Sequence, residues 1–191
     1  MSGSRYFVIV VDDFSRYTWV FLMKSHSELL DIYHNFAKMV ETQFSKPIKA
    51  FRSDNALEYT QHDFQSILKH YGTVSHLSCL GTSQENGRAE CKLRHILDIV
   101  RALLLSTSLP TPFWGEATLT AMYTINRLPT PILDNCTPHE RIFGLVPSYH
   151  HLRIFGSACF VLLQPHERTK LEPCSRLCYF LGYGVEQKCY R

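Results

Sequence analysis

The sequence lacks the long apolar runs of membrane-spanning helices. None of its apolar stretches reaches the roughly 18 consecutive residues that a transmembrane helix needs. The apolar run from Tyr6 to Val11 is short, lacks a small-residue cleavage site and is followed at once by Asp12-Asp13, so it is not typical of a signal peptide. We therefore interpret this run as a β-strand and expect no membrane partner.

The cysteines lack the spacing of a metal or redox motif. No Cys-x-x-Cys occurs, and Cys174 and Cys178 have no matching His or Cys pair. We interpret the cysteines as reduced thiols of an intracellular protein, with a zinc site as the less favoured alternative. The ten histidines show no metal-ligand spacing either. The seven cysteines are Cys79, Cys91, Cys136, Cys159, Cys174, Cys178 and Cys189.

Charge is modest in amount and nearly balanced in sign. Charged residues make up 19% of the 191 residues, and the formal net charge is +3. This balance is compatible with nucleic-acid binding but does not predict it, so the placement of individual charges must carry that argument. The length and the hydrophobic share of 45% favour a globular chain with one domain of ordinary size and a smaller one.

Hydrophobic periodicity predicts a layered α/β domain in the first part of the chain. Two β-rich runs, at 6–11 and 17–23, flank the turn residues Asp12 to Ser15 and predict an antiparallel hairpin. Strands then alternate with helices, which is typical of α/β or α+β layers. The elements expected after the hairpin are a helix at 25–44, a strand at 48–52, a helix at 61–71, a strand at 73–77, a helix at about 85–107 and a helix at 113–127.

The composition changes after residue 127. Residues 128–148 carry four prolines among polar residues and predict a linker or boundary. The short β-like runs that follow are separated by glycines, as at the start of a small β-barrel. We therefore predict one domain at 1–135 and a second at 136–191. The β-like runs are 154–155, 158–163 and 177–181.

Two acidic residues stand out for their positions. Asp54 follows the predicted strand at 48–52, and Glu90 lies at the start of the long helical pattern. Strand ends of open sheets face the crevice where ligands bind, and carboxylates on a strand end and on a helix can converge on divalent metals. Taken singly, Asp54 also fits a turn residue that caps the following amides, and Glu90 fits a solvated helix acid.

The segments around these acids resemble the integrase core of copia-type retrotransposons. The family has a segment like Arg-Ser-Asp-Asn-Gly-Gly-Glu-Tyr, and this chain has Arg52-Ser53-Asp54-Asn55-Ala56-Leu57-Glu58-Tyr59. The family's Glu lies in a segment like Thr-Pro-Gln-Gln-Asn-Gly-Val-Ala-Glu-Arg-Lys-Asn-Arg, and this chain has Thr82-Ser83-Gln84-Glu85-Asn86-Gly87-Arg88-Ala89-Glu90-Cys91-Lys92-Leu93-Arg94. The resemblance extends over nearly the whole chain. The further similar segments are Val11–Trp19, Phe113–Ala117, Asn126–Pro129, Leu152–Gly156 and Phe180–Tyr183.

The resemblance implies a fold and an activity. It implies an RNase H-like integrase core, a mixed five-stranded sheet with flanking helices, whose first strand would precede Tyr6 and is missing here, followed by a partial SH3-like β module. Proteins of this kind are parts of a Pol polyprotein that bind Mg²⁺ or Mn²⁺, process the 3′ ends of element cDNA and join them to target DNA. Asp54 and Glu90 match the second and third acids of the family's catalytic signature, so the resemblance makes both of them catalytic metal ligands.

The sequence departs from the family pattern near these acids. The family's first Asp would lie upstream of Met1, and Asp12 and Asp13 are better interpreted as turn residues than as its substitutes. Leu93 replaces an asparagine, Cys91 replaces a basic residue, and Ala56-Leu57 replace a Gly-Gly pair that gives backbone freedom. We therefore expect little or no strand transfer by these 191 residues alone.

The helix that begins near residue 85 is the expected contact with DNA. Arg88, Lys92 and Arg94 lie close to Glu90 in the sequence and can approach phosphates, and Asn86 fits a loop that leads into the helix. Contacts of this kind position DNA without specifying its sequence. A solvated polar helix face is the alternative interpretation of these residues.

The resemblance also implies partners and a location. We expect element cDNA ends and target DNA as partners, a homo-oligomer in the intact family protein, and a place in the nucleus and in cytoplasmic particles. The alternative function is that of a non-catalytic nucleic-acid-binding remnant of the same fold. DNA binding that ignores Mg²⁺ and survives Glu90→Gln would favour this alternative.

Overall fold

The computed structural model describes residues 3–78, 86–184 and 190–191. The chain divides into two compact units. Residues 2–10 and 19–94 form the helix–sheet unit, and residues 11–18 and 95–191 form the C-terminal unit. Residues 79–84, between the predicted strand at 73–77 and the predicted helix at about 85–107, lie outside the described residues.

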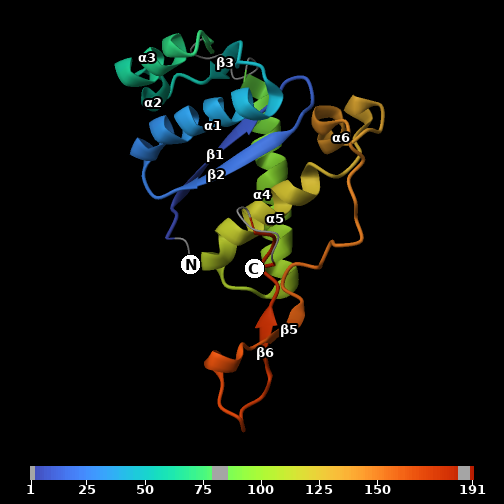
Figure 1. The fold of residues 1–191 in the computed structure, drawn as a ribbon. Helices are drawn as coiled ribbons and strands as arrows, with labels where there is room; N and C mark the ends of the chain where they lie inside the picture. The colour runs from blue at the N-terminus through green and yellow to red at the C-terminus, as the bar shows by residue number, and fades with distance from the viewer. Residues whose placement is uncertain (1–2, 79–85, 185–189) are drawn as a thin grey trace. The chain divides into compact units, whose positions relative to one another are not determined.

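The order of the elements along the chain follows the predicted alternation (Figure 1). The described strands pair as β1 with β2, β3 with β4 and β5 with β6. The strands are β1 (Tyr6–Val11), β2 (Thr18–Met23), β3 (Ala50–Ser53), β4 (Val74–Leu77), β5 (Ala158–Leu162) and β6 (Ser175–Tyr179). The α-helices are α1 (Leu29–Phe44), α2 (Leu57–Thr60), α3 (His62–His70), α4 (Gly87–Thr107), α5 (Trp114–Ile125) and α6 (Pro138–Phe143).

The turn between β1 and β2 is held by Asp12. Its Oδ2 accepts hydrogen bonds from the backbone N of Ser15 at 2.7 Å and from Ser15 Oγ at 2.6 Å. The backbone N of Asp12 donates to Tyr17 O at 2.9 Å, which closes the hairpin at this end. Asp13 pairs with Arg16 at 2.9 Å. The structure therefore gives these two acids the turn role that the sequence indicates.

The long helix α1 supplies the core of the helix–sheet unit. Its buried residues, Leu29, Tyr33, Phe36 and Ala37, recur at the helical spacing that predicted it. Ser25 caps the preceding 3₁₀ turn by accepting from Ser27 N, and Ser45 ends α1 with a positive φ of 53° just before Lys46-Pro47. Buried Phe64 and Leu68 of α3 pack into the same cluster. Helix α1 thus packs against α3 in a cluster that also contacts Phe51 of β3.

Strands β3 and β4 are parallel and are joined through α3. Parallel pairing needs a crossover connection, which is usually a helix, and here Ala50 pairs with Val74 and Ser53 with Leu77. Gly72, with φ of 64°, ends the crossover just before β4. The short helix α2, which the periodicity did not predict, lies between β3 and α3. This βαβ arrangement places Asp54 directly after the carboxyl end of a parallel strand.

Helices α4 and α5 follow the predicted ranges closely. Helix α4 ends at Thr107 before Pro110, and α5 begins at Trp114. Ile96 and Val100 are the buried residues of α4. Ala117, Ala121 and Ile125 line the buried side of α5. No helix in the described part of the chain is long and apolar enough to cross a membrane.

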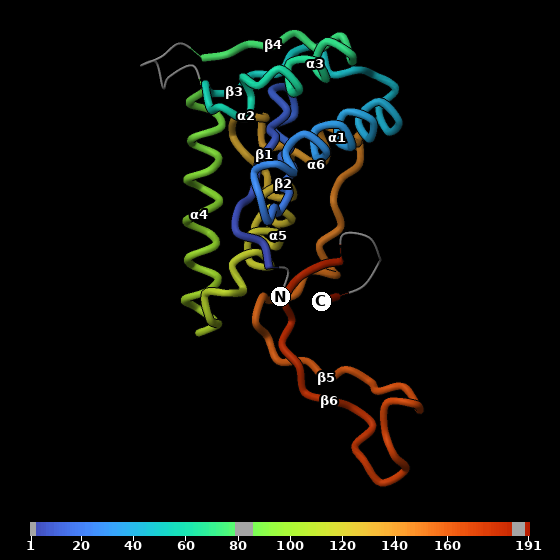
Figure 2. The backbone as a smooth tube through the Cα atoms, turned by 90° about the vertical axis from the view of Figure 1, so that its left-hand side faces the viewer, coloured from blue at the N-terminus to red at the C-terminus, as the bar shows by residue number. Residues whose placement is uncertain are grey.

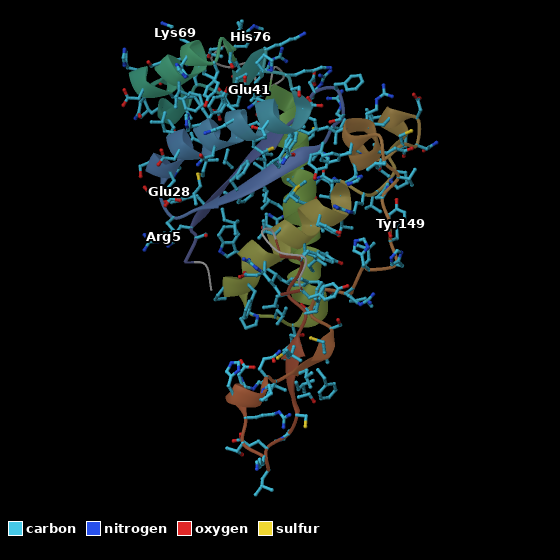
Figure 3. All side chains as sticks on the ribbon, in the orientation of Figure 1. Arg5, Glu28, Glu41, Lys69, His76 and Tyr149 are labelled. Carbon is cyan, nitrogen blue, oxygen red and sulfur yellow. The ribbon has the colours of Figure 1, made fainter. Side chains whose placement is uncertain are left out.

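The segment after α5 carries more structure than a bare linker. Helix α6 begins at a Thr137 cap, whose Oγ1 accepts from Glu140 N at 3.0 Å, and Gly144 ends it with φ of 69°. Beyond α6, Tyr149 lies on an extended stretch (Figure 3) and its hydroxyl donates to Arg127 O at 2.8 Å. The boundary predicted at residues 135/136 stays a prediction.

The C-terminal strands β5 and β6 form an antiparallel hairpin. Ala158 pairs with Tyr179 and Leu162 with Ser175. The predicted β-like run Ile154-Phe155 is wrong, because these residues belong to a turn. Ile154 O accepts from Ser157 N at 3.1 Å, and Gly156 has a φ of 75°, which a strand does not allow.

Candidate functional site

Asp54 lies in the turn that follows β3. Ser53 is buried, whereas Asp54 is exposed. Asp54 Oδ1 accepts a long hydrogen bond of 3.3 Å from the backbone N of Ala56, which is the turn interaction that its type favours. The carboxylate therefore caps its own turn and still faces solvent.

Asn55 fixes the turn to the neighbouring strand. Its Nδ2 donates to Ser78 O at 2.7 Å, and Ser78 N donates to Ser53 O at 3.1 Å. These two bonds extend the parallel pairing one step beyond Ser53 and Leu77. As a result, the backbone on either side of Asp54 is held at the end of the β3–β4 pair.

Tyr59 ties the other side of this turn to the core. Its ring packs against Phe51 and Phe64 with centroid distances of 5.9 and 5.3 Å. Burial, followed by the negative charges of Asp54 and Glu58, raises the pKa of Tyr59 from 10.0 to about 12. The negative charge of Asp54 therefore contributes to the raised pKa of the Tyr59 hydroxyl.

Gln65 of α3 completes the support of this segment. Its Nε2 donates to Tyr59 O at 2.7 Å and to Ser75 Oγ of β4 at 3.2 Å. The sequence patterns did not predict Gln65, Asn55 and Tyr59 as supporting residues. Asn55 follows Asp54 directly at a predicted strand end, and this position was the one available signal for it.

Glu90 lies in the first turn of α4 and is exposed. The partial positive charge at a helix N-terminus favours an acid at this place. The first turns of α4, through Arg94, belong to the same compact unit as β3 and Asp54. Figure 1 and Figure 2 both show the beginning of α4 near β3. The structure therefore brings the two predicted acids into one unit, from a strand end and a helix start.

The three basic residues of α4 lie on two different stripes of the helix. Successive residues rotate by about 100° around the axis, so Arg88 and Lys92 share one stripe. Glu90 and Arg94 share another stripe, roughly 160° away. Arg88, Glu90 and Arg94 are exposed and Lys92 is half-buried, while Asn86 lies half-buried just before the helix. Only Arg94 therefore shares the face of Glu90.

A complete metal centre is not assembled within residues 3–78, 86–184 and 190–191. These residues contain no group of three His, Cys, Asp or Glu side chains that could hold a metal ion. Asp54 and Glu90 stay predictions as metal ligands. Their oxygens are of the type that Mg²⁺ and Mn²⁺ take, and both side chains are exposed.

Two family models match separate parts of the chain. Residues 2–83 match the integrase core domain, and residues 157–191 match the retroviral polymerase SH3-like domain. Both matches are accompanied by similarity to Pol polyproteins over nearly the full chain. The chain is homologous to the retrovirus-related Pol polyproteins of copia-type transposons. The recognition made from the motifs around Asp54 and Glu90 is thus confirmed.

Three curated relatives of this chain come from plants. The chain is 39% identical to the retrovirus-related Pol polyproteins from transposons RE2 and RE1 of Arabidopsis thaliana, with 97% of the chain covered in each case. It is 38% identical over its full length to the Pol polyprotein from transposon TNT 1-94 of Nicotiana tabacum. The chain spans 13–14% of the length of these relatives.

A solved structure shares the fold of the integrase core. The catalytic core domain of HTLV-2 integrase, determined in complex with magnesium in a trimeric form, matches with a TM-score of 0.53 and 20% identity. The match covers 70% of this chain and 81% of that one. The predicted RNase H-like integrase fold with an SH3-like C-terminal part is thereby confirmed. The described strands of this chain form three two-stranded sheets.

Proposed function

We propose that this chain supplies part of the active site and of the DNA-binding surface of a retrotransposon integrase. In this proposal, Asp54 and Glu90 hold divalent cations, and Arg88, Lys92, Arg94 and Asn86 hold DNA. The observation that carries it is the joint placement of Asp54 and Glu90 in one compact unit, within an integrase-family chain. The element cDNA ends and target DNA are the proposed partners.

The acids fit a divalent cation by their chemistry. Asp54 and Glu90 offer exposed carboxylate oxygens, which hard cations prefer. Bound cations would supply Lewis-acid stabilisation of the attacking and leaving oxygens of a phosphodiester. The chain's own task is orientation, since Asn55 and Tyr59 fix the turn that carries Asp54. Mg²⁺ is the proposed cofactor, with Mn²⁺ as a substitute.

The described residues provide two carboxylates for this task. The family resemblance places a further Asp on a strand before Tyr6, and two carboxylates hold cations less well than three. We therefore propose that the polypeptide of residues 1–191 performs little or no 3′-end processing and strand transfer by itself. In the full assembly we propose a homo-oligomer that acts in the nucleus and in cytoplasmic particles.

A joining assay tests this proposal. Labelled branched DNA is incubated with Mn²⁺ and either residues 1–191 or a hybrid in which the segment preceding the matched region of the Nicotiana relative is placed before Met1. We expect joining by the hybrid alone, and its loss in Asp54→Asn and Glu90→Gln. Glu58→Gln, a neighbouring acid, is the matched control and should retain joining. Joining that survives Asp54→Asn would contradict the proposal.

One observation favours a second candidate function, that of a non-catalytic nucleic-acid-binding module. The described residues contain no group of three side chains that could hold a metal. This alternative predicts salt-dependent DNA binding that is equal with and without Mg²⁺. It also predicts an inactive hybrid whose DNA affinity is unchanged by Glu90→Gln. The same variants therefore separate the two functions.

A further inference from the structure

The β5–β6 hairpin places two cysteines directly opposite each other. Cys159 of β5 and Cys178 of β6 are register partners in the antiparallel pair. Directly opposed residues project to the same side of a sheet. Both thiols are free and both residues are half-buried. Their pairing is a feature of the register and was not visible in the spacing of the cysteines along the sequence.

The Cα–Cα distance expected at this position in the ladder allows a disulfide. Leu163 N donates to Cys174 O at 2.9 Å, so Leu163 and Cys174 are a hydrogen-bonded pair. Hydrogen-bonded pairs alternate with non-hydrogen-bonded pairs along an antiparallel ladder. Cys159 and Cys178 lie four residues away from that pair on their strands, so they also form a hydrogen-bonded pair. Such hydrogen-bonded positions have Cα atoms about 5.5 Å apart, which lies within the range of roughly 4.4–6.8 Å for disulfides. Opposed Cβ atoms at hydrogen-bonded positions lie near the upper end of the range of about 4.5–5.5 Å, so closing the bond requires them to approach by about 1 Å or more.

We propose that Cys159 and Cys178 form a reversible cross-strand disulfide by exchange with a disulfide of the glutathione class. One cysteine thiolate attacks a sulfur of oxidised glutathione, forms a mixed disulfide and releases one glutathione thiolate. The opposite thiolate then attacks the protein sulfur and releases the second glutathione. The two cysteines lose two protons and two electrons in total, and the glutathione disulfide gains the two electrons.

Within the described residues, strands β5 and β6 pair only with each other. A two-stranded hairpin is marginally stable alone, and the face opposite the cysteines carries exposed Phe160, Leu162, Leu177 and Tyr179. Cross-linking at the second of the five register pairs prevents the strands from separating or slipping there while leaving this apolar face unchanged. Forming or reducing the disulfide would therefore raise or lower the stability of the hairpin. This effect does not depend on Asp54 and Glu90.

Cys174 provides an internal control. It is exposed, and its alternation places it on the same side of β6 as Cys178. Its partner in the register extended beyond β5 is Leu163, so it has no thiol opposite. If exposure alone decided reactivity, Cys174 would take up glutathione at least as readily as the opposed pair would close.

The test is thiol mapping of the full 191-residue chain. The folded chain is equilibrated at a series of reduced-to-oxidised glutathione ratios, free thiols are then alkylated, and peptides are mapped by mass spectrometry. We expect a Cys159–Cys178 disulfide. The equilibrium constant for its closure should be at least about tenfold higher in the folded chain than in urea, because the fold raises the effective concentration of one thiol at the other. Oxidation should also slow amide exchange in β5 and β6.

Three variants complete the test, with circular dichroism to check folding. Cys159→Ser and Cys178→Ser should each abolish closure and leave a persistent glutathione adduct on the remaining partner. Cys174→Ser should close like the parent chain. The proposal is wrong if the folded parent forms only mixed glutathione disulfides, if Cys178 bonds to Cys174 instead, or if closure is equal in urea.

Discussion

Asn126 and Thr18 exchange two hydrogen bonds across 108 residues of sequence. Thr18 N donates to Asn126 Oδ1 at 3.0 Å, and Asn126 Nδ2 donates to Thr18 O at 2.8 Å. The side-chain amide of Asn126 thus hydrogen-bonds to both backbone groups of Thr18, the first residue of β2, as the backbone of a neighbouring strand would. Both residues are buried. Asn126 O in turn accepts from His139 N at 2.8 Å, so the same residue also holds the start of α6.

Removing the Asn126 side chain should destabilise the chain strongly. Asn126→Ala leaves the buried N–H and C=O of Thr18 without partners, at a cost of about 3 kcal/mol. Urea unfolding followed by circular dichroism measures this loss. Asn35→Ala, at an exposed position of α1, is the matched control and should change stability by less than about 0.5 kcal/mol. Equal stability of both variants would contradict the role of this contact.

Asp12 and Asp13 should differ in their effect on stability. Asp12→Ala removes the acceptor of two bonds from buried Ser15, and we expect a loss of about 1–3 kcal/mol. Asp13→Ala removes a surface pair with Arg16, worth below about 1 kcal/mol. The midpoint of urea unfolding measures both. If Asp13→Ala proved the more harmful, the turn assignment of Asp12 would be wrong.

The titration of Tyr59 should report the charge of Asp54. The pKa of Tyr59 is raised to about 12 by burial first and then by Asp54 and Glu58. Asp54→Asn removes one negative charge, so the pKa of Tyr59 should fall while staying above 10.0. Phenolate absorbance, compared with that of Tyr59→Phe, isolates this group. Asp63→Asn is the control and should leave the titration of Tyr59 unchanged.

The raised pKa also makes stability depend on alkaline pH. The folded state holds the Tyr59 proton up to about pH 12, whereas the unfolded chain releases it near the ordinary value of 10.0. This contribution to stability is therefore complete below pH 10 and is lost as the pH rises from about 10 to 12. Tyr59→Phe should lose less stability across that interval. A parallel decline in both chains would contradict this assignment.

The sequence predicted elements whose signals are local. Hydrophobic periodicity predicted helices at 25–44 and at about 85–107, where the structure has α1 and α4. It also placed Asp54 at a strand end and Glu90 at a helix start. The bond from Asn55 to Ser78 and the exchange between Thr18 and Asn126 were missed. Such contacts join residues that periodicity does not relate, because only the tertiary fold determines which distant backbone groups need a partner.

The basic residues of α4 should contribute to DNA binding through charge alone. Arg88→Ala and Arg94→Ala should each weaken binding to unrelated DNA sequences equally and lower the salt slope by about one. Fluorescence anisotropy at several salt concentrations measures this. Arg101→Ala is the control on the same helix, since Arg101 pairs with Asp98 at 2.9 Å. Loss of affinity for one sequence only, or an equal effect of Arg101→Ala, would contradict the assignment.

Asp54 and Glu90 should hold a divalent cation together. Paramagnetic broadening of amide signals during Mn²⁺ titration of the 191-residue chain tests it without requiring catalysis. We expect broadening centred on the turn after β3 and the first turn of α4, abolished by Asp54→Asn and by Glu90→Gln and retained in Asp12→Asn. Broadening that lies elsewhere, or that persists in both acid variants, would show that these carboxylates do not form the site.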